Sequence, residues 1–401
     1  MAPFGGRRRR AFGGSVSLQP LVPIIASPAR VAFDLTPTQN AHRNRGIGRY
    51  VKGLAIQLAS QTEVPIEFWG WSYARPFEPP APHRAVWLRR YGMPRSRAAW
   101  LFAKLAIRLF AQRSAARVVH VTDPNALVLL QGRQMLTTVY DLTPLLEPNS
   151  DRRFFEGRDY LHYLKRLQRV DRIFAISNQT AEDLRQHRGI PGSRIVLAPP
   201  GVDLVLTPRV TGGIAATPYF LYVGSPEPHK NVSALLQALT LAPDLPEQLV
   251  IAGTWYPKHL EQLHREADQV PGLGNRIRYR GFIPDAELGP LIASATALVV
   301  PSRREGFGLP VAEGLAAGGV VIHSRIPVLA EVSDGAALTF DPDSPAELAA
   351  RLRQVSQDGD LRRELQQRGL RRSQALTWDR ALADTLAVYR EVLAAGGSGR
   401  H

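Results

Sequence analysis

The second half of the chain alternates short apolar runs with longer stretches of helical periodicity. The apolar runs occupy residues 219–225, 248–254, 276–282, 296–302 and 320–324. Runs of this kind are typical of strands that are buried on both faces of a sheet. Strands that alternate with helices indicate a parallel sheet with crossover helices. The pattern therefore predicts an α/β domain over residues 219–375.

The first half shows a looser version of the same alternation. A helical pattern begins at Arg49, and apolar runs lie at 30–36, 66–71, 117–122, 134–142 and 172–177. Proline and glycine then cluster without periodicity as far as Pro218, which is typical of a connecting segment. We predict a second α/β domain over 29–205, a linker over 206–218 and a final helical segment over 376–396.

The chain shows no sign of a membrane span or a disulfide framework. No apolar run approaches the roughly 20 residues that a membrane-spanning helix needs. Residues 1–28 combine a basic start with a short apolar patch that proline interrupts, so we expect a disordered basic leader rather than a signal peptide. The absence of cysteine excludes disulfides, thiolate metal sites and cysteine nucleophiles, and it fits a reducing compartment.

The formal net charge of +15 favours a polyanionic partner. Nucleic acid, anionic lipid and phosphorylated small molecules all satisfy this condition. The basic residues are dispersed along the chain, and none of the familiar groove-reading or base-stacking motifs is present. We therefore expect no nucleic-acid partner, and a basic nucleic-acid-binding protein remains a remote alternative.

The stretch "PSRREGFGLPVAEGLAAGG" (301–319) carries the first candidate chemistry. It follows a predicted buried strand, and Pro310 marks the first turn of a helix. Glu305 falls in the loop and Glu313 in the helix, at the strand edge where open α/β sheets bind ligands. Carboxylates there can accept hydrogen bonds from the hydroxyls of a sugar or ribose. The alternative is ordinary surface charge, because a glutamate near a helix N-terminus is favoured by the helix dipole alone.

Two further loops between a strand and a helix have the same form. In "YVGSPEPHKN", Lys230 lies at a helix N-terminus, where a cation is unfavourable unless an anion lies beside it. Lys230 and its neighbour His229 would suit a diphosphate, and the alternative is an exposed lysine in a turn. In "NRGIGRYVKGL", Gly46 and Gly48 indicate a loop of close backbone approach, and the alternative is an ordinary glycine turn.

These segments together resemble the retaining glycosyltransferases of family 4. The resemblance runs from about residue 30 to residue 395, and its strongest mark is the E-x₇-E element "EGFGLPVAEGLAAG". Supporting marks are "GIGRY", "YDLTPL", "ISNQTAEDL", "APPGVD", "VGSPEPHKN", "RYRGFIPDAEL" and "LTWDRALADTL". The resemblance implies the GT-B fold, in which two Rossmann-like domains face each other across a cleft and a C-terminal helix crosses back to the N-terminal domain.

The resemblance also implies roles for the residues of the second domain. Glu313 would bind the ribose hydroxyls of a nucleotide-sugar donor, and Glu305 would contact the transferred sugar. Lys230 would neutralise the diphosphate. The backbone amides around Phe307, Gly308 and Leu309 would hold the sugar or its phosphates. On the other side of the cleft, Gly46 and Gly48 would shape the donor site.

The chain departs from the family pattern at two positions. Ser225 stands where many members carry an arginine, so one cation is missing, and His229, Arg303 or Arg304 would have to compensate. Tyr140 stands before Asp141 where many members have histidine. Asp141 is therefore our first candidate for the group of the first domain that meets the sugar, and His120 is the second. A buried core histidine is the equal alternative for His120.

The implied activity is retaining, metal-independent transfer of a sugar to a glycan or a lipid-linked glycan in polysaccharide or O-antigen biosynthesis. GDP-mannose is the leading donor, and a UDP-sugar or GDP-rhamnose is the alternative. We expect no cofactor and no metal, because Lys230 can neutralise the diphosphate. A phosphorylase or a nucleotide-sugar epimerase can share the architecture. The E-x₇-E element and "GIGRY" favour the transferase over both.

Residues 95–117 form the most membrane-like stretch. On a helix, Arg97, Lys104 and Arg108 fall on one side and apolar residues cover much of the rest. A basic amphipathic helix can lie on an anionic membrane surface. The alternative is a core helix with a solvated basic face. We expect a cytoplasmic protein, with peripheral contact to the inner face of the plasma membrane if the first alternative holds.

Overall fold

The computed structural model of the protein describes residues 31–395, except for 41, 44, 73–76, 84, 90–113, 115, 125–126, 128–132, 147–156 and 203–216. Three expected segments therefore lie wholly or mostly outside the described residues. These are the leader over 1–28, the linker over 206–218 and the amphipathic helix over 95–117. Among the described residues, no helix is both long and apolar enough to cross a membrane.

The N-terminal sheet has seven strands in the order β3-β2-β1-β4-β5-β6-β7, and its described pairs are all parallel. The strands are β1 (Val31–Asp34), β2 (Ile66–Ser72), β3 (Ala85–Arg89), β4 (Val118–Val121), β5 (Gln134–Val139), β6 (Arg172–Ala175) and β7 (Ile195–Leu197). The accompanying helices are η1 (Thr36–Thr38), α1 (Gly46–Ser60), α3 (Thr143–Leu146), α4 (Gly157–Leu167), α5 (Asn178–Arg188) and η4 (Gly192–Arg194).

The C-terminal sheet has six parallel strands in the order β10-β9-β8-β11-β12-β13. The strands are β8 (Tyr219–Val223), β9 (Gln248–Ala252), β10 (Ile277–Gly281), β11 (Ala297–Val300), β12 (Val321–Ser324) and β13 (Leu338–Phe340). The helices are η6 (Pro228–Lys230), α6 (Val232–Thr240), α7 (Pro257–Asp268), η7 (Gly274–Arg276), α8 (Asp285–Ser294), α9 (Leu309–Ala316), α10 (Pro327–Ser333), α11 (Pro345–Gln357), α12 (Gly359–Ser373) and α13 (Trp378–Ala395).

Both sheets change direction beside their first strand. The chain moves outward from β1 to β3 and then returns to place β4 on the other side of β1; β8 and β11 repeat this arrangement in the second sheet. The central strands β1, β4 and β11 are buried along their whole length, as continuous apolar strands covered on both faces should be. Ligands of doubly wound sheets bind at such reversal points, outside the carboxyl ends of the strands.

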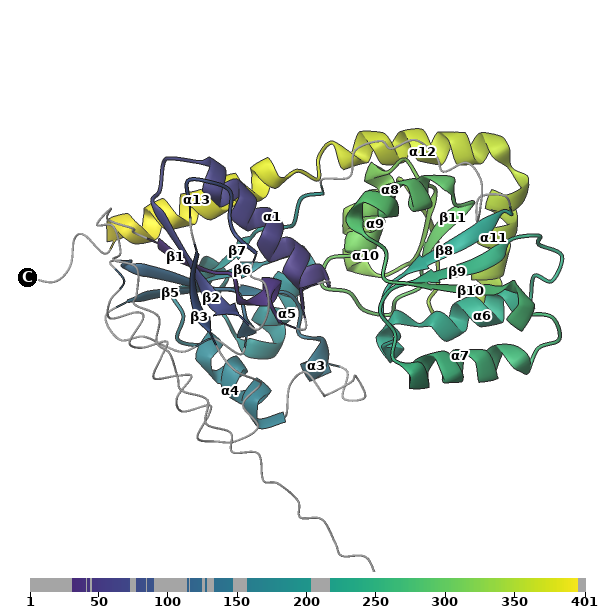
Figure 1. Ribbon diagram of the computed structural model, residues 1–401, viewed down its shortest axis with the longest axis horizontal. Helices are drawn as coiled ribbons and strands as arrows, with labels where there is room; N and C mark the ends of the chain where they lie inside the picture. The colour runs from purple at the N-terminus through teal and green to yellow at the C-terminus, as the bar shows by residue number, and fades with distance from the viewer. Residues whose placement is uncertain are drawn as a thin grey trace, which may run out of the picture.

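The last helix leaves the C-terminal domain and packs on the N-terminal one. Figure 1 shows the two sheets in separate lobes, with α12 over one lobe and α13 lying on the other beside α1. Trp378 at the start of α13 packs on Tyr50 of α1, with ring centroids 6.0 Å apart. Further along, Tyr389 is fully buried against β4. The chain thus crosses between the domains twice.

The alternation of apolar and helical segments predicted both α/β domains, and the structure confirms the two parallel sheets. Three strands were not predicted, namely β3, β7 and β13. Two of them have only three residues each, and all three lie at or next to sheet edges, where little apolar patterning is needed. Residues 345–373 form two successive helices, because Asp358 ends α11 and caps α12 through its side chain.

Candidate active site

The loops that follow β8 and β11 lie side by side, because these strands are neighbours at the reversal point of the C-terminal sheet. The first loop ends in Lys230 and the second contains Glu305. Nζ of Lys230 lies 2.8 Å from Oε1 and 2.7 Å from Oε2 of Glu305. Glu305 accepts a third hydrogen bond from the hydroxyl of Ser302, two residues after β11, which lies 2.7 Å from Oε1. The two residues that sequence analysis placed in separate motifs are therefore in direct contact.

Glu305 is an ionised carboxylate held below the surface. Burial alone would raise its pKa, but the charge and hydrogen bonds of Lys230, the Ser302 hydroxyl and His229 outweigh that effect and hold the pKa below its usual range. Burial and the neighbouring Lys230 in turn lower the pKa of His229. The imidazole of His229 therefore lies beside the ion pair and is less readily protonated than a free histidine.

Asn231 ties the two loops together. Its backbone is in the left-handed region, with φ of 57°, which asparagine tolerates better than most residues. Its side-chain amide donates to the carbonyl of Pro301 at 3.1 Å and to the carbonyl of Pro342 at 2.9 Å. The backbone N–H of Arg303 adds a bond to the carbonyl of His229 at 2.7 Å. These bonds hold the loop that carries Lys230 against the loop that carries Glu305.

The glycines between the two glutamates allow the domains to approach. A Cβ on Gly306 would stand 2.3 Å from the carbonyl oxygen of Tyr140 in the N-terminal domain. Gly308 has φ of +97° and leads directly into α9, so a side chain there would be strained. Between them, Phe307 is buried in the apolar core. The backbone amides of Phe307, Gly308 and Leu309 lie at the start of α9, a position that favours anions.

Glu313 is buried in α9 and meets a cation from the opposite domain. The guanidinium of Arg49, in the first turn of α1, forms an ion pair with the Glu313 carboxylate and lies 3.6 Å from the exposed carboxylate of Asp285. Burial raises the pKa of Glu313 to about 7, with Asp285 adding to this rise and Arg49 opposing it. The ionisation of Glu313 therefore depends on a residue of the other domain.

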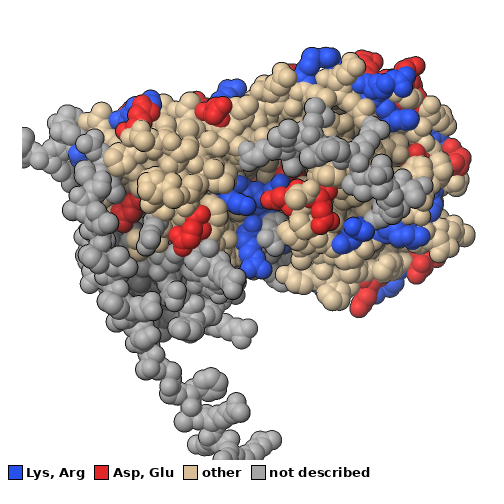
Figure 2. Space-filling view, turned by 45° about the horizontal axis from the view of Figure 1, so that its top comes forward, with Lys and Arg blue, Asp and Glu red and all other residues tan. Residues whose placement is uncertain are grey.

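The first turn of α1 contains the expected glycines. Gly46 faces Leu309, and a Cβ there would lie 3.2 Å from the Leu309 side chain. Gly48 packs on the loop before the helix, where a Cβ would stand 2.4 Å from the carbonyl oxygen of His42. The start of α1 is thus held against the start of α9. Figure 2 shows basic side chains gathered where the two halves of the molecule meet, with acidic side chains beside them.

Asp141 lies at the junction between the domains, next to the glycine loop. Its carboxylate accepts the N–H of Thr143, the first residue of α3, at 2.8 Å. A Cβ on Gly306 would lie 3.4 Å from Cβ of Asp141. The adjacent Tyr140 carbonyl accepts a bond from the hydroxyl of Thr180, which also lies 3.4 Å from the Gly306 carbonyl. The structure therefore brings Asp141 to the same edge as Glu305.

His120 lies elsewhere, in the core of the N-terminal domain. Its side chain is fully buried on β4, one ring nitrogen lies 2.7 Å from the Tyr389 hydroxyl, and the other lies 2.9 Å from the Thr138 hydroxyl. Burial lowers the pKa of His120 to about 3. The structure therefore favours the alternative for His120, a core histidine that joins α13 to the sheet, over a catalytic contact with a sugar.

The two arginines that follow β11 are each paired with an acidic residue. Arg303 pairs with the exposed Asp343, and Arg304 pairs with Asp183 of α5 at 3.2 Å. Ser225 contributes its carbonyl, which accepts the Tyr222 hydroxyl at 2.7 Å. A further arginine reaches this region from the N-terminal domain. Arg45, directly before α1, lies 3.1 Å from Glu227.

Four residues of this region were not predicted. Arg45, Arg49 and Glu227 pair across the junction between the domains, and Asn231 joins loops within the C-terminal domain. A signal for Arg49 was present, because it is a cation in the first turn of a helix, the feature that singled out Lys230. Among the described residues, no group of three or more histidines, aspartates and glutamates could hold a metal ion.

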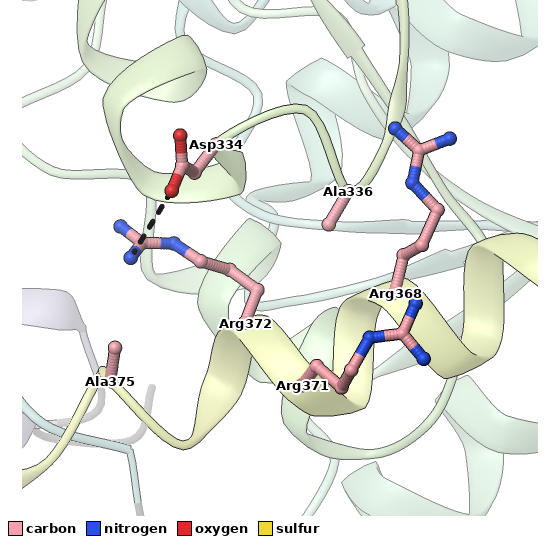
Figure 3. A pocket seen from close by; sticks show the side chains of 6 residues that line it. All are labelled: Asp334, Ala336, Arg368, Arg371, Arg372 and Ala375. Atoms are coloured by element: carbon pink, nitrogen blue, oxygen red, sulfur yellow. Dashed lines mark ion pairs between the residues drawn. The ribbon is translucent and has the colours of Figure 1, made fainter.

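A surface hollow of about 360 Å³ lies apart from these residues. Figure 3 shows it between α10 and α12, with the guanidinium of Arg372 turned toward Asp334. Arg372 also donates to the carbonyls of Glu331 and Val332, and Arg368 donates to the carbonyl of Gly335. These bonds satisfy the C-terminal end of α10, where cations are favoured. The arrangement of these arginines is thus explained by helix capping.

Two family models match the chain. The model described as Glycosyltransferase Family 4 matches residues 44–206, and the model described as Glycosyl transferases group 1 matches residues 210–372. Together they span both domains. The chain belongs to the family 4 glycosyltransferases.

Several characterised relatives of this glycosyltransferase act on sugars. O-antigen chain mannosyltransferase B of Escherichia coli is 28% identical over 286 residues, which cover 67% of this chain and 73% of the relative. The serotype-specific mannosyltransferase WbdA of Escherichia coli is 28% identical over 255 residues, and these cover only 31% of that longer protein. D-inositol 3-phosphate glycosyltransferase of Thermobifida fusca is 32% identical over 246 residues, or 56% of each chain.

Solved structures share the fold. Sucrose-phosphate synthase from Thermosynechococcus elongatus aligns over 91% of this chain and 99% of its own, with a TM-score of 0.77 and 22% identity. HepE of Anabaena, solved in complex with UDP and glucose, aligns over 90% of this chain and 100% of its own, with a TM-score of 0.71 and 15% identity. At these identities the likeness concerns the fold alone. It confirms the GT-B arrangement that the resemblance implied.

Proposed function

We propose that this glycosyltransferase moves a sugar from a nucleotide-sugar donor to a glycan or lipid-linked glycan, with retention at the anomeric carbon and without a metal ion. The observation that carries the proposal is the contact between Lys230 and Glu305 beside the start of α9. An ammonium, a carboxylate and free helix N–H groups meet there at the reversal point of the sheet. This combination suits a ligand that carries both phosphate and sugar hydroxyls.

The residues divide the donor between them. The diphosphate lies at Lys230 and the N-terminus of α9, where positive charge and N–H groups stabilise the charge that develops on the leaving group. Glu305 accepts hydrogen bonds from hydroxyls of the transferred sugar. Glu313 accepts hydrogen bonds from the ribose hydroxyls, because its carboxylate is buried in α9 below the same edge of the sheet. Asp141 faces this group from the N-terminal domain and contacts the sugar or the acceptor.

Transfer proceeds on one face of the donor sugar. The bond between the anomeric carbon and the diphosphate oxygen breaks, and the acceptor oxygen bonds to the same carbon from the same face. The acceptor's proton passes to an oxygen of the departing phosphate, so the nucleoside diphosphate leaves with that proton. No carboxylate nucleophile is needed in this scheme, since Glu305 is committed to Lys230. In this scheme Lys230 neutralises the leaving group without a metal ion.

GDP-mannose is the donor that we propose, and an O-antigen or related polysaccharide intermediate is the acceptor. Support comes from the relatives named as O-antigen chain mannosyltransferases at 28% and 26% identity. A UDP-sugar or GDP-rhamnose remains the alternative donor. The cytoplasmic location also stays a prediction.

A nucleotide-sugar panel tests this proposal. The purified chain is incubated with GDP-mannose, GDP-rhamnose, UDP-glucose and UDP-galactose in the presence of mannose-containing acceptor glycans, with and without EDTA. Release of GDP and an α-linked product from an α-linked donor are expected, with equal rates in EDTA. Turnover with UDP-sugars only would reject GDP-mannose, loss of activity in EDTA would reject metal independence, and an inverted anomer by NMR would reject retention.

Contact of residues 95–117 with an anionic membrane also stays a prediction. Flotation with vesicles of phosphatidylglycerol and phosphatidylethanolamine tests it on the whole chain. Reversing the charges of Arg97, Lys104 and Arg108 should reduce the floated fraction, because basic side chains near an anionic surface contribute about 1 kcal/mol each. Equal flotation of the variant and the wild type would leave the core-helix alternative.

A further inference from the structure

The start of α1 spans both ends of the proposed donor site. Arg45, directly before the helix, contacts Glu227, which lies three residues before Lys230. Arg49, one turn further along, contacts Glu313. Gly46 lies between them and faces Leu309, the first residue of α9. A donor with its diphosphate at Lys230 and its ribose at Glu313 therefore runs along this turn of α1.

The C-terminal domain by itself supplies little positive charge to a diphosphate. Lys230 is shared with Glu305, and Ser225 carries no charge. Arg303 and Arg304 are paired with Asp343 and Asp183. A diphosphate leaving group carries at least two negative charges, so one ammonium already opposed by a carboxylate leaves it under-neutralised. The opposite domain is a source of a second cation.

Arg49 can change partners. Its ion pair uses the carboxylate to which the ribose hydroxyls of the proposed donor would bind, so donor and guanidinium compete for Glu313. Glu313 is almost fully buried, whereas about a third of the Arg49 side chain is exposed. A buried carboxylate needs hydrogen-bond donors at all times, and two ribose hydroxyls can replace the guanidinium in that role. Once replaced, the guanidinium is released from Glu313 and can turn toward the diphosphate, whose oxygens it can bind as a fork.

We propose that Arg49 supplies the second cation for the donor's diphosphate from the opposite domain, and that it exchanges its ion pair with Glu313 for this contact when the donor binds. The inference rests on the proposed function, because it assumes a nucleoside diphosphate at Lys230. A residue of the N-terminal domain then supplies the positive charge that is missing at Ser225. It also makes full neutralisation of the leaving group depend on the two domains being together.

Calorimetric titration of the whole chain with GDP, UDP and ADP, and with guanosine, uridine and adenosine, tests the inference. In Arg49→Gln, the diphosphate that binds the wild type should bind roughly 10- to 100-fold more weakly, as expected for the loss of a hydrogen bond between charged groups. The matching nucleoside should keep its affinity within about threefold, because it carries no phosphate. Arg49→Lys should fall between, since it keeps the charge and loses the fork.

Two comparisons separate a phosphate contact from indirect effects. Arg380→Gln removes an exposed arginine of α13 that pairs with Asp384, and it should leave the binding of every probe unchanged. In a Glu313→Gln background, Arg49→Gln should still weaken diphosphate binding by roughly the same factor, because Arg49 then acts on the phosphate itself. Melting temperatures of all variants check that each one is folded. If Arg49→Gln does not fold, Arg49→Lys is used for the comparison in its place.

The outcomes that overturn the inference differ from failure of the proposed function. A wild type that binds none of the three diphosphates rejects the proposed function and this inference with it. A wild type that binds one of them, with unchanged affinity in Arg49→Gln, rejects the inference alone. Equal weakening of diphosphate and nucleoside, or a loss that vanishes in the Glu313→Gln background, also rejects it and leaves Arg49 as a structural partner of Glu313.

Discussion

The ammonium of Lys230 lies 2.8 and 2.7 Å from the two carboxylate oxygens of Glu305, although 75 positions separate the residues in the chain. The contact exists because β8 and β11 are neighbours in the sheet and each ends in a loop that points to the same edge. Lys230 keeps the Glu305 carboxylate ionised below the surface by lowering its pKa. Substitution of either one therefore changes both charge and position at the site.

Glu305→Gln should mainly slow transfer. The variant keeps the shape of the side chain and loses the charge that holds both Lys230 and the sugar hydroxyls. We expect kcat to fall by roughly 10²–10³, the usual effect of removing one preorganised polar group, with a smaller change in donor affinity. Steady-state kinetics with the donor found in the panel measures this. Glu261→Gln on the surface of α7 is the matched control, and a Glu305→Gln variant with wild-type kcat would contradict the assignment.

Glu313→Gln should mainly weaken donor binding and should remove a pH dependence. The Glu313 pKa of about 7 lies above the ordinary 4.5 of a free carboxyl, so the folded protein keeps this proton over a pH range in which the unfolded chain has lost it. Stability from this group is therefore greatest below about pH 4.5 and is lost as the pH rises to about 7. The loss is on the order of 3 kcal/mol. Arg49 and Asp285 are the charged groups that contribute to this shift.

The measurement is the melting temperature of Glu313→Gln minus that of the wild type, at pH 5, 6, 7 and 8. The difference should rise with pH, because only the wild type pays to ionise a buried carboxyl. In the wild type, nucleotide affinity should strengthen as the pH rises through about 7. A difference that is flat across this range would show that Glu313 is already ionised at pH 5.

His120→Phe should destabilise the fold and leave transfer intact. The ring shape is roughly kept, but the hydroxyls of Tyr389 and Thr138 lose a buried partner, which costs about 1–3 kcal/mol. The pKa of His120, lowered to about 3, lies below its ordinary 6.5, so the wild type itself loses stability as the pH falls below 6.5. The difference between variant and wild type should therefore shrink in acid. A folded variant with kcat reduced a hundredfold would restore the catalytic interpretation.

Gly306→Ala should separate the domains rather than unfold them. A Cβ there would stand 2.3 Å from the Tyr140 carbonyl of the opposite domain, so the loop and that backbone cannot keep their present distance. We expect kcat/KM to fall at least tenfold, with little change in melting temperature, because the clash lies at the junction and not in either core. Gly192→Ala is the control, since its φ is not in the left-handed region and a Cβ there would meet only Cδ of the Arg185 side chain, at 4.0 Å.

The parts of the fold that depend on local pattern were predictable. Buried parallel strands need continuous apolar residues, and this need marked β8, β9, β11 and β12 clearly. Strand β7 has three half-buried residues, so it leaves no such mark. It forms because a neighbouring strand offers a free edge, and that is a tertiary effect.

The candidate site was predictable as far as loops that follow strands. The positions of Glu305, Lys230 and Glu313 followed from the order of strand, loop and helix. Their partners did not, because spacing along the chain carries no information about which residue of one domain faces which residue of the other. Arg49 pairs with Glu313 across 264 positions for this reason. His120 illustrates the same limit, since an apolar strand with one histidine looks alike whether the ring faces a core or a ligand.

The return of α13 to the N-terminal domain has a consequence for biosynthesis. The C-terminal domain is one uninterrupted segment and can complete its core as soon as the ribosome has released it, whereas the N-terminal domain lacks Trp378 and Tyr389 until α13 has been translated. The N-terminal domain, although translated first, is therefore completed after the C-terminal domain. During that interval α13 does not yet cover the apolar faces of α1 and β4. These faces are then exposed to chaperones that bind nascent chains.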